Sequence, residues 1–343
     1  MEKKKNNRQN TVSITGYLKE NNLEKIVNSR QEDVIRGSLL VAVSELNCHK
    51  VQFYVSSKTK EGEKSQDYEK LLSLLPSETV SVASFLKDNP GSNFEQAAQA
   101  ATKVWVVAKL EEFVSTNSDN RTMSMVTLKG FKAGIKTATD SSPFVPHADF
   151  TVDAYIENMY PEMEGDTPET TQETGRQILF CLIPNYDKSV NKISFIAPVE
   201  NKDGVKVAEY VAKNYHVGDT VTLKGSVVNI VERIVKEPVN EEEYFGVAPT
   251  PQYETRFIHE RLIAGGSSKA IPETDTRYIS AKEAKDGLAE REIKAKKNGE
   301  TRANKAAAQQ SAAAADDFGA PANASKGTVA PTETPEFAKD LDF

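Results

Sequence analysis

Alternation of apolar and polar residues predicts a chain built mainly from β-strands. In residues 11–19, every second residue is apolar or glycine and the residues between them are polar or aromatic. A period of two is typical of a strand with one buried and one exposed face. Helix-like stretches fall at 68–75, 94–101 and 205–214. The predicted strands cover 11–19, 34–44, 50–57, 103–115 and 122–134, and then 150–158, 176–183, 192–199, 220–236 and 253–264.

The order of three strands, a helical stretch and two strands occurs twice, and it is the order of the five-stranded OB barrel. Gly16, Gly130 and Gly225 stand within strands, where glycine suits the sharp bend that closes a small barrel. We therefore expect a mainly β protein with two OB-like five-stranded barrels, an OB-like nucleic-acid-binding domain at 1–145 and a second OB-like domain at 146–280.

The last sixty residues differ in composition from both repeats. Residues 281–315 are rich in Ala, Lys and Glu but have a poor apolar stripe, which predicts a charged, helix-prone linker that is solvated or partly ordered. Residues 316–343 are rich in Ala, Pro, Thr and Asp, and they hold too little apolar surface to offset the entropy of ordering. We expect this segment to be a disordered acidic tail.

Charge is distributed unevenly along these segments. The chain of 343 residues has a formal net charge of −7, which divides into +3 for 1–145, −9 for 146–280, +3 for 281–315 and −4 for 316–343. Because attraction to phosphate depends on the local face presented, an acidic total does not exclude nucleic acid. The first repeat is the better candidate for a phosphate-binding surface.

The composition also bears on the compartment. No stretch reaches the ~18–20 apolar residues of a membrane helix, and the Lys- and Asn-rich start is unlike a signal peptide. The only cysteines, Cys48 and Cys181, lie far apart in apolar runs, which argues against a disulfide framework or a cysteine metal site. These features favour a soluble protein of a reducing cytoplasm, the host cell cytoplasm if the protein is viral.

Motifs of enzymes are missing from the sequence. There is no phosphate-binding Gly-rich loop with Lys-Ser/Thr and no Gly-x-Ser-x-Gly elbow. The four histidines stand singly, without partners at metal-ligand spacing, and the acidic run 241–243 has the character of a solvated turn. We expect no catalytic site, no metal and no cofactor.

The polar faces of the first repeat's strands carry an aromatic beside a cation. Flat rings stack on unpaired bases while ammonium groups meet phosphates, and the stacking tolerates any base sequence. Aromatics are also common in strand cores, so Trp105 and Phe131 have a core reading as an open alternative. The candidate nucleic-acid-binding residues are Tyr17, Lys19, Arg36, Lys50, Tyr54, Lys58, Lys103, Trp105, Lys109, Lys129 and Phe131.

The second repeat has comparable aromatics and cations, among them Phe180, Phe257, Lys192 and Arg261. Its balance of −9 argues against a primary phosphate-binding role. A supporting, oligomer-forming or weaker binding barrel is the expected assignment, and a homo-oligomer is compatible with it.

The chain stops at Asp340, Leu341, Asp342 and Phe343, after a Pro- and Thr-rich stretch. Acidic residues followed by a hydrophobic C-terminal residue resemble the partner-docking tip of bacterial and bacteriophage single-stranded DNA-binding proteins. The bacterial tip usually ends in a Pro-Phe step, which Leu341 and Asp342 replace here. The resemblance implies that these four residues recruit replication and recombination proteins.

Together these features predict a non-enzymatic protein that coats single-stranded DNA in replication, recombination and repair, of bacteriophage or bacterial origin. Two alternatives stay open: a structural or assembly protein that makes protein contacts only, and a metal-dependent nuclease. The sequence leaves open the preference between DNA and RNA, the site size and the oligomeric state.

Overall fold

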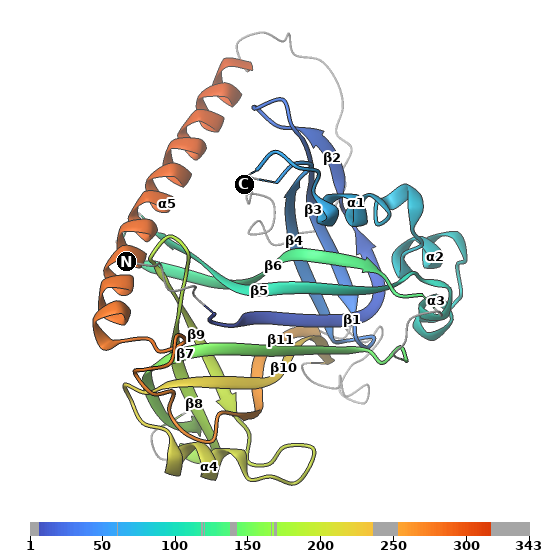
Figure 1. The fold of residues 1–343 in the computed structure, drawn as a ribbon. Coiled ribbons are helices and arrows are strands. Elements are labelled where there is room, and N and C mark those ends of the chain that lie inside the picture. The colour runs from blue at the N-terminus through green and yellow to red at the C-terminus, as the bar shows by residue number, and fades with distance from the viewer. Residues whose placement is uncertain are drawn as a thin grey trace, which may run out of the picture. The chain divides into compact units, whose positions relative to one another are not determined.

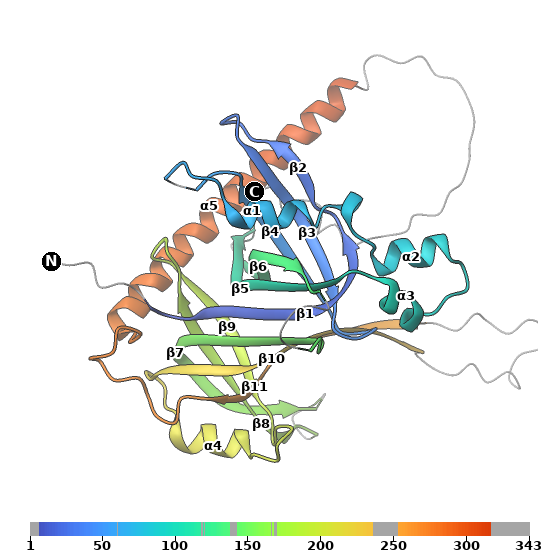
Figure 2. The same cartoon turned by 45° about the vertical axis from the view of Figure 1, so that its right-hand side comes forward.

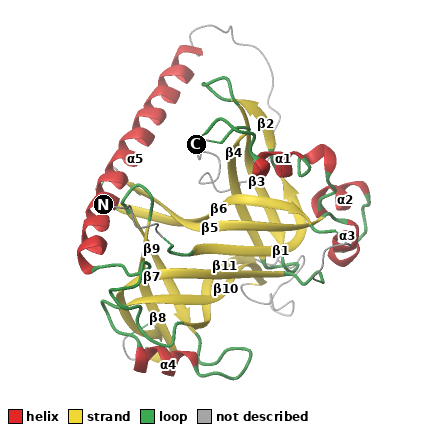
Figure 3. Cartoon of the chain, in the orientation of Figure 1, coloured by secondary structure: helices red, strands yellow, loops and turns green. Residues whose placement is uncertain are grey.

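The computed structural model describes residues 7–59, 61–117, 119, 121–137, 143–165, 167, 170–235 and 253–316. The chain is mainly β with a long C-terminal helix, as expected (Figure 3). The strands are β1 (Asn10–Asn21), β2 (Glu24–Val27), β3 (Asp33–Ala42), β4 (Cys48–Ser56), β5 (Lys103–Thr116), β6 (Thr122–Ile135), β7 (His147–Glu164), β8 (Gln172–Pro184), β9 (Val190–Ala197), β10 (Thr220–Val235) and β11 (Tyr253–Gly266). The helices are α1 (Gln66–Leu72), η1 (Pro76–Glu78), α2 (Val82–Asp88), α3 (Phe94–Ala100), α4 (Val207–Asn214) and α5 (Ala281–Asp316).

Among the described residues, eleven strands form one sheet in the order β10-β11-β9-β8-β7-β1-β5-β6-β4-β3-β2. Each of the ten predicted strands overlaps one of them, and β2 is the strand that the sequence pattern missed. The helices α1, α3 and α4 fall on the predicted helical stretches, whereas α2 was not predicted. Short helices such as α2 depend on their caps, here a capping box between Ser81 and Ser84.

Strand pairing follows the same course in each repeat. We call the described residues 7–113 and 124–137 the first half, and 143–279 the second half. In the first half the pairings lead from β1 through β3, β4, β6 and β5 back to β1, and β4–β6 is the parallel pair. In the second half they lead from β7 through β8, β9, β11 and β10 back to β7, with β9–β11 parallel. The pairings therefore form two closed circuits of five strands.

The two halves are joined edge to edge. Residues 10–15 of β1 pair antiparallel with residues 147–152 of β7, so that β1 lies between β5 and β7 (Figures 1 and 2). One continuous core fills both halves, from Ile14 and Val104 in the first to Phe150 and Phe195 in the second. The rings of Phe150 and Phe195 lie 5.1 Å apart.

Glycine permits the close approach of neighbouring strands at two of the predicted bends. A Cβ added at Gly16 would lie 2.4 Å from the carbonyl oxygen of Ala42, and one at Gly225 would lie 1.9 Å from that of Leu262. Either contact would push the strands apart, because real Cβ atoms do not approach so closely.

The chain divides into two compact units. Residues 1–113 and 124–292 belong to the first, and residues 114–123 and 293–343 to the second. Both halves lie in the first unit, and the predicted domain boundary after residue 145 stays a prediction. In the second unit Asn298 donates to the carbonyl of Val114 at 2.7 Å, and Gly299 lies against the backbone of Thr116.

The first turns of α5 pack more closely than a solvated linker would. Ile279 and Ala284 are buried with Leu182 and Val190 in a cluster of their own. Gly287 lets the helix approach Val190, where an added Cβ would lie 2.5 Å from the valine side chain. The predicted tail lies outside the described residues from residue 317 onward.

Candidate nucleic-acid interface

Strand alternation sorts the candidate residues onto one face of the first half. Val51 and Phe53 of β4 are buried in the core, and Lys50 and Tyr54 between and beside them are exposed. The same alternation in β5 buries Val104 and leaves Trp105 half-buried on the opposite side. We call the side away from the core the outer face.

Five of the predicted residues come together on β3, β4 and β6. Arg36 lies opposite Tyr54 in the β3–β4 ladder, and the β4–β6 ladder pairs Gln52 with Lys129. Paired residues of neighbouring strands project to the same face. Tyr54 is 43% exposed and Phe131 is 40% exposed, so both rings are accessible. We define the outer-face patch as Arg36, Lys50, Tyr54, Lys129 and Phe131.

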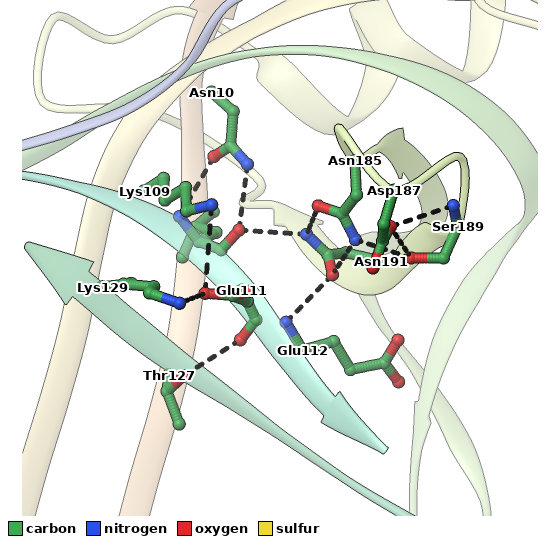
Figure 4. Close-up of polar contacts among 11 residues, drawn as sticks. Asn10, Lys109, Glu111, Glu112, Thr127, Lys129, Asn185, Asp187, Ser189 and Asn191 are labelled. Carbon is green, nitrogen blue, oxygen red and sulfur yellow. Dashed lines mark hydrogen bonds and ion pairs between the residues drawn. The ribbon is translucent and has the colours of Figure 1, made fainter. Parts of the chain in front are cut away.

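Carboxylates hold some of these cations. Arg36 forms an ion pair with Glu24 on the neighbouring β2, at 2.6 Å. Glu111 of β5 faces Lys129 at 3.4 Å and Lys109 at 4.0 Å (Figure 4). Such exposed pairs are weak in water, so an incoming phosphate can compete for the lysines.

Tyr17, Lys103 and Trp105 form a second group on β1 and β5. Tyr17 lies opposite Lys103, and Thr15 lies opposite Trp105. The Tyr17 ring is half-buried, because it packs against the cluster of α2 and α3 and meets the Phe144 ring edge-on at 5.1 Å. The open stacking surface predicted at Tyr17 is therefore partly covered by the protein itself.

Lys103 and Trp105 each have a partner that sequence reasoning did not identify. Lys103 Nζ lies 5.0 Å from the Phe144 ring centre, and Lys70 Nζ of α1 lies 5.8 Å from the Trp105 ring. The Trp105 ring lies over Gly134 of β6, where an added Cβ would come within 2.9 Å. Lys70 and Phe144 come from segments distant in sequence, which is why strand alternation could not find them.

Lys19 and Lys58 lie apart from the outer-face patch. Lys19 Nζ donates to the carbonyl oxygen of Glu45 and to Cys48 Sγ, each at 3.2 Å. Lys58 is exposed just after β4 and forms an isolated bridge with Lys64. These two lysines are not brought next to the exposed rings by any printed register pair or contact.

Groups typical of catalysis or metal binding are not assembled in the part of the chain that the structure describes. No group of three or more His, Cys, Asp or Glu side chains there could hold a metal ion. His49 is buried, and desolvation lowers its pKa to about 4, so it is a neutral core residue at neutral pH. Among the described helices none is long and apolar enough to cross a membrane.

Comparison with known proteins gives one family and two similar structures. The single-stranded DNA-binding protein from Thermus aquaticus aligns with a TM-score of 0.40 at 10% identity, over 78% of this chain and 96% of that chain. A deletion mutant of the Thermus aquaticus protein aligns with a TM-score of 0.40 at 11% identity, over 78% and 98%. No curated protein sequence matches. The YorF family model matches residues 8–301, which is most of the chain, and this protein therefore belongs to the YorF family.

Proposed function

We propose that this protein binds single-stranded DNA without sequence preference through the outer-face patch, and that each circuit of five strands is an OB-type barrel. The observation that supports this most strongly is the pair of exposed rings, Tyr54 and Phe131, on strands that also carry Lys50 and Lys129. Rings and cations at this spacing suit bases and phosphates of one strand. The order of pairings, with one parallel pair in each circuit, matches the OB topology.

The proposal assigns the binding energy to two separable terms. Stacking on a ring is independent of salt, whereas each lysine that meets a phosphate releases counterions. A structural protein without a nucleic-acid site would show neither term. A nuclease would degrade labelled single strand in the presence of magnesium, which the proposal does not expect. The replication, recombination and repair roles belong to the same proposal, as does a bacteriophage or bacterial origin.

Lys50→Ala tests the electrostatic term. We expect it to lower the slope of log affinity against log salt for oligo(dT) by about 0.7, one phosphate contact for a single strand. Lys202→Ala in an exposed turn of the second half is the matched control and should leave the slope unchanged. Equal slopes for Lys50→Ala, the control and the wild type would remove Lys50 from the interface.

We also propose that Asp340, Leu341, Asp342 and Phe343 dock replication and recombination proteins. Deletion of Phe343 alone is expected to abolish partner binding, because its ring would enter an apolar pocket and its carboxylate would meet a basic residue. Oligo(dT) affinity should stay nearly unchanged. Pull-down with purified replication and recombination proteins measures the first effect. Partner binding that survives this deletion would show that the C-terminal residue is not the docking element.

A further inference from the structure

A row of apolar side chains crosses four neighbouring strands of the second half. Tyr160 of β7 lies opposite Ile178 of β8, and Ile178 lies opposite Ile196 of β9. Ile196 is paired with Leu262 of β11. Their neighbours Leu179, Phe195 and Ile263 are buried in the core, so the row projects from the outer face.

The row is accessible and includes aromatic surface. Tyr160 is 41% exposed, and Ile178, Ile196 and Leu262 are half-buried. The Phe180 ring stacks on Tyr160 with centroids 5.5 Å apart. We call these five residues the apolar row. Contiguous apolar surface with a polar rim is typical of protein interfaces, whose cores are enriched in aromatic residues.

The corresponding position in the first half is polar. The parallel pair β4–β6 sets Gln52 beside Lys129, whereas the parallel pair β9–β11 sets Ile196 beside Leu262. The two halves therefore share a strand order but present different chemistry at the same kind of site. A nucleic-acid surface needs cations there, and the second half has none in the row.

The rim of the apolar row carries both signs of charge. Lys192 Nζ pairs with Glu157 at 2.8 Å, and Arg176 pairs with Glu162 at 3.2 Å and Glu260 at 2.7 Å. These carboxylates neutralise the cations that phosphate would need, in a segment whose balance is −9. A two-fold axis places the same surface on both partners, so a rim with both signs can set a carboxylate of one copy against a cation of the other.

We propose that the apolar row is the interface with a second copy of this chain, in a two-fold dimer held by the row and ringed by Lys192, Arg176 and their carboxylates. The inference goes beyond the proposed function, since the row lies on the second half and the outer-face patch on the first. It leaves the first half's rings open to DNA in each copy.

Sedimentation equilibrium of the full chain tests this proposal. The wild type should show a mass approaching twice that of one 37.7 kDa chain as concentration rises. Ile196→Glu should raise the dimer dissociation constant at least about tenfold, the change that 1.4 kcal/mol gives. Tyr160→Glu, at a more exposed position, should do the same and guards against unfolding of the first variant. Gln52→Glu is the matched control for mass, with the same charge placed on the first half.

Each outcome has a definite meaning. A wild type that sediments as a monomer throughout, or row variants that dimerise as tightly as Gln52→Glu, would overturn the proposal. If the wild type is monomeric and Tyr160→Glu weakens oligo(dT) binding, the row is a nucleic-acid face instead. A monomeric row variant that still binds oligo(dT) supports both proposals, and a dimer that binds no oligo(dT) contradicts the proposed function alone.

Discussion

Tyr54→Ala is expected to weaken binding to oligo(dT) by about 1–3 kcal/mol, which is about 5- to 150-fold. The ring is 43% exposed on the outer face of β4, so its loss removes a stacking surface and little core packing. The slope of affinity against salt should stay as in the wild type, since stacking releases no counterion. Fluorescence anisotropy of labelled oligo(dT) at several salt concentrations measures both quantities.

Phe131→Ala on β6 should produce a loss of the same order, because this ring is 40% exposed on the same face. Tyr186→Ala is the control, since Tyr186 is 97% exposed on a turn of the second half. A Tyr54→Ala protein that keeps its thermal stability and binds like the Tyr186→Ala control would rule out Tyr54 as a stacking residue. A Tyr54→Ala protein that unfolds would assign the ring to the core.

Glu112→Ala is expected to lower the free energy of unfolding by about 3–5 kcal/mol, the cost of breaking a buried ion pair from one side. The Glu112 side chain is 1% exposed, and both its oxygens accept from Arg291 of α5, at 2.8 and 2.5 Å. The backbone N–H of Lys192 donates to the same carboxylate at 2.8 Å. Removing the carboxylate leaves the Arg291 guanidinium, 14% exposed, and a backbone donor without this partner.

Glu111→Ala is the matched control for urea unfolding. Glu111 is the next residue of β5, 23% exposed on the other face, and its pairs with Lys109 and Lys129 should contribute under about 1 kcal/mol (Figure 4). Replacing Glu112 and Arg291 together by Leu should recover much of the loss, since no buried charge is then left unpaired. Equal losses for Glu111→Ala and Glu112→Ala would show that the buried pair has no special weight.

A polar network around Glu112 explains why this link matters for the fold. Asn191 accepts from the backbone N–H of Glu112 at 3.1 Å and donates to the carbonyl oxygen of Leu110 at 3.2 Å. Asn10 binds the same Leu110 backbone with both its amide atoms. Figure 4 shows the turn around Asn185 meeting β5 through Asn191. The network thus ties the second half to the first through buried, directed hydrogen bonds.

Period-two alternation was enough to predict the strands and their outer faces. It worked for Tyr54, because Val51 and Phe53 mark the buried face of β4 unambiguously. It failed for β2, whose four residues are too few for a pattern. These successes depend on contacts within a strand and its immediate neighbours.

The misses concern contacts between segments distant in sequence. The cover over Tyr17 comes from α2, α3 and Phe144, which no local pattern places there. The packing of α5 uses Ala284 and Gly287, whose small side chains leave a weak apolar stripe. Arg291 looks like one more surface cation of a charged helix until the fold brings Glu112 to it.

The central claim is that the first half binds single strand, and one titration tests it most directly. The full chain is titrated with oligo(dT) at low and raised salt, with the fluorescence of Trp105, the one tryptophan of the sequence, as the readout. The account predicts saturable binding that weakens steeply with salt, together with a change in Trp105 emission, because this half-buried ring lies on the outer face. Absence of binding at low salt would contradict it.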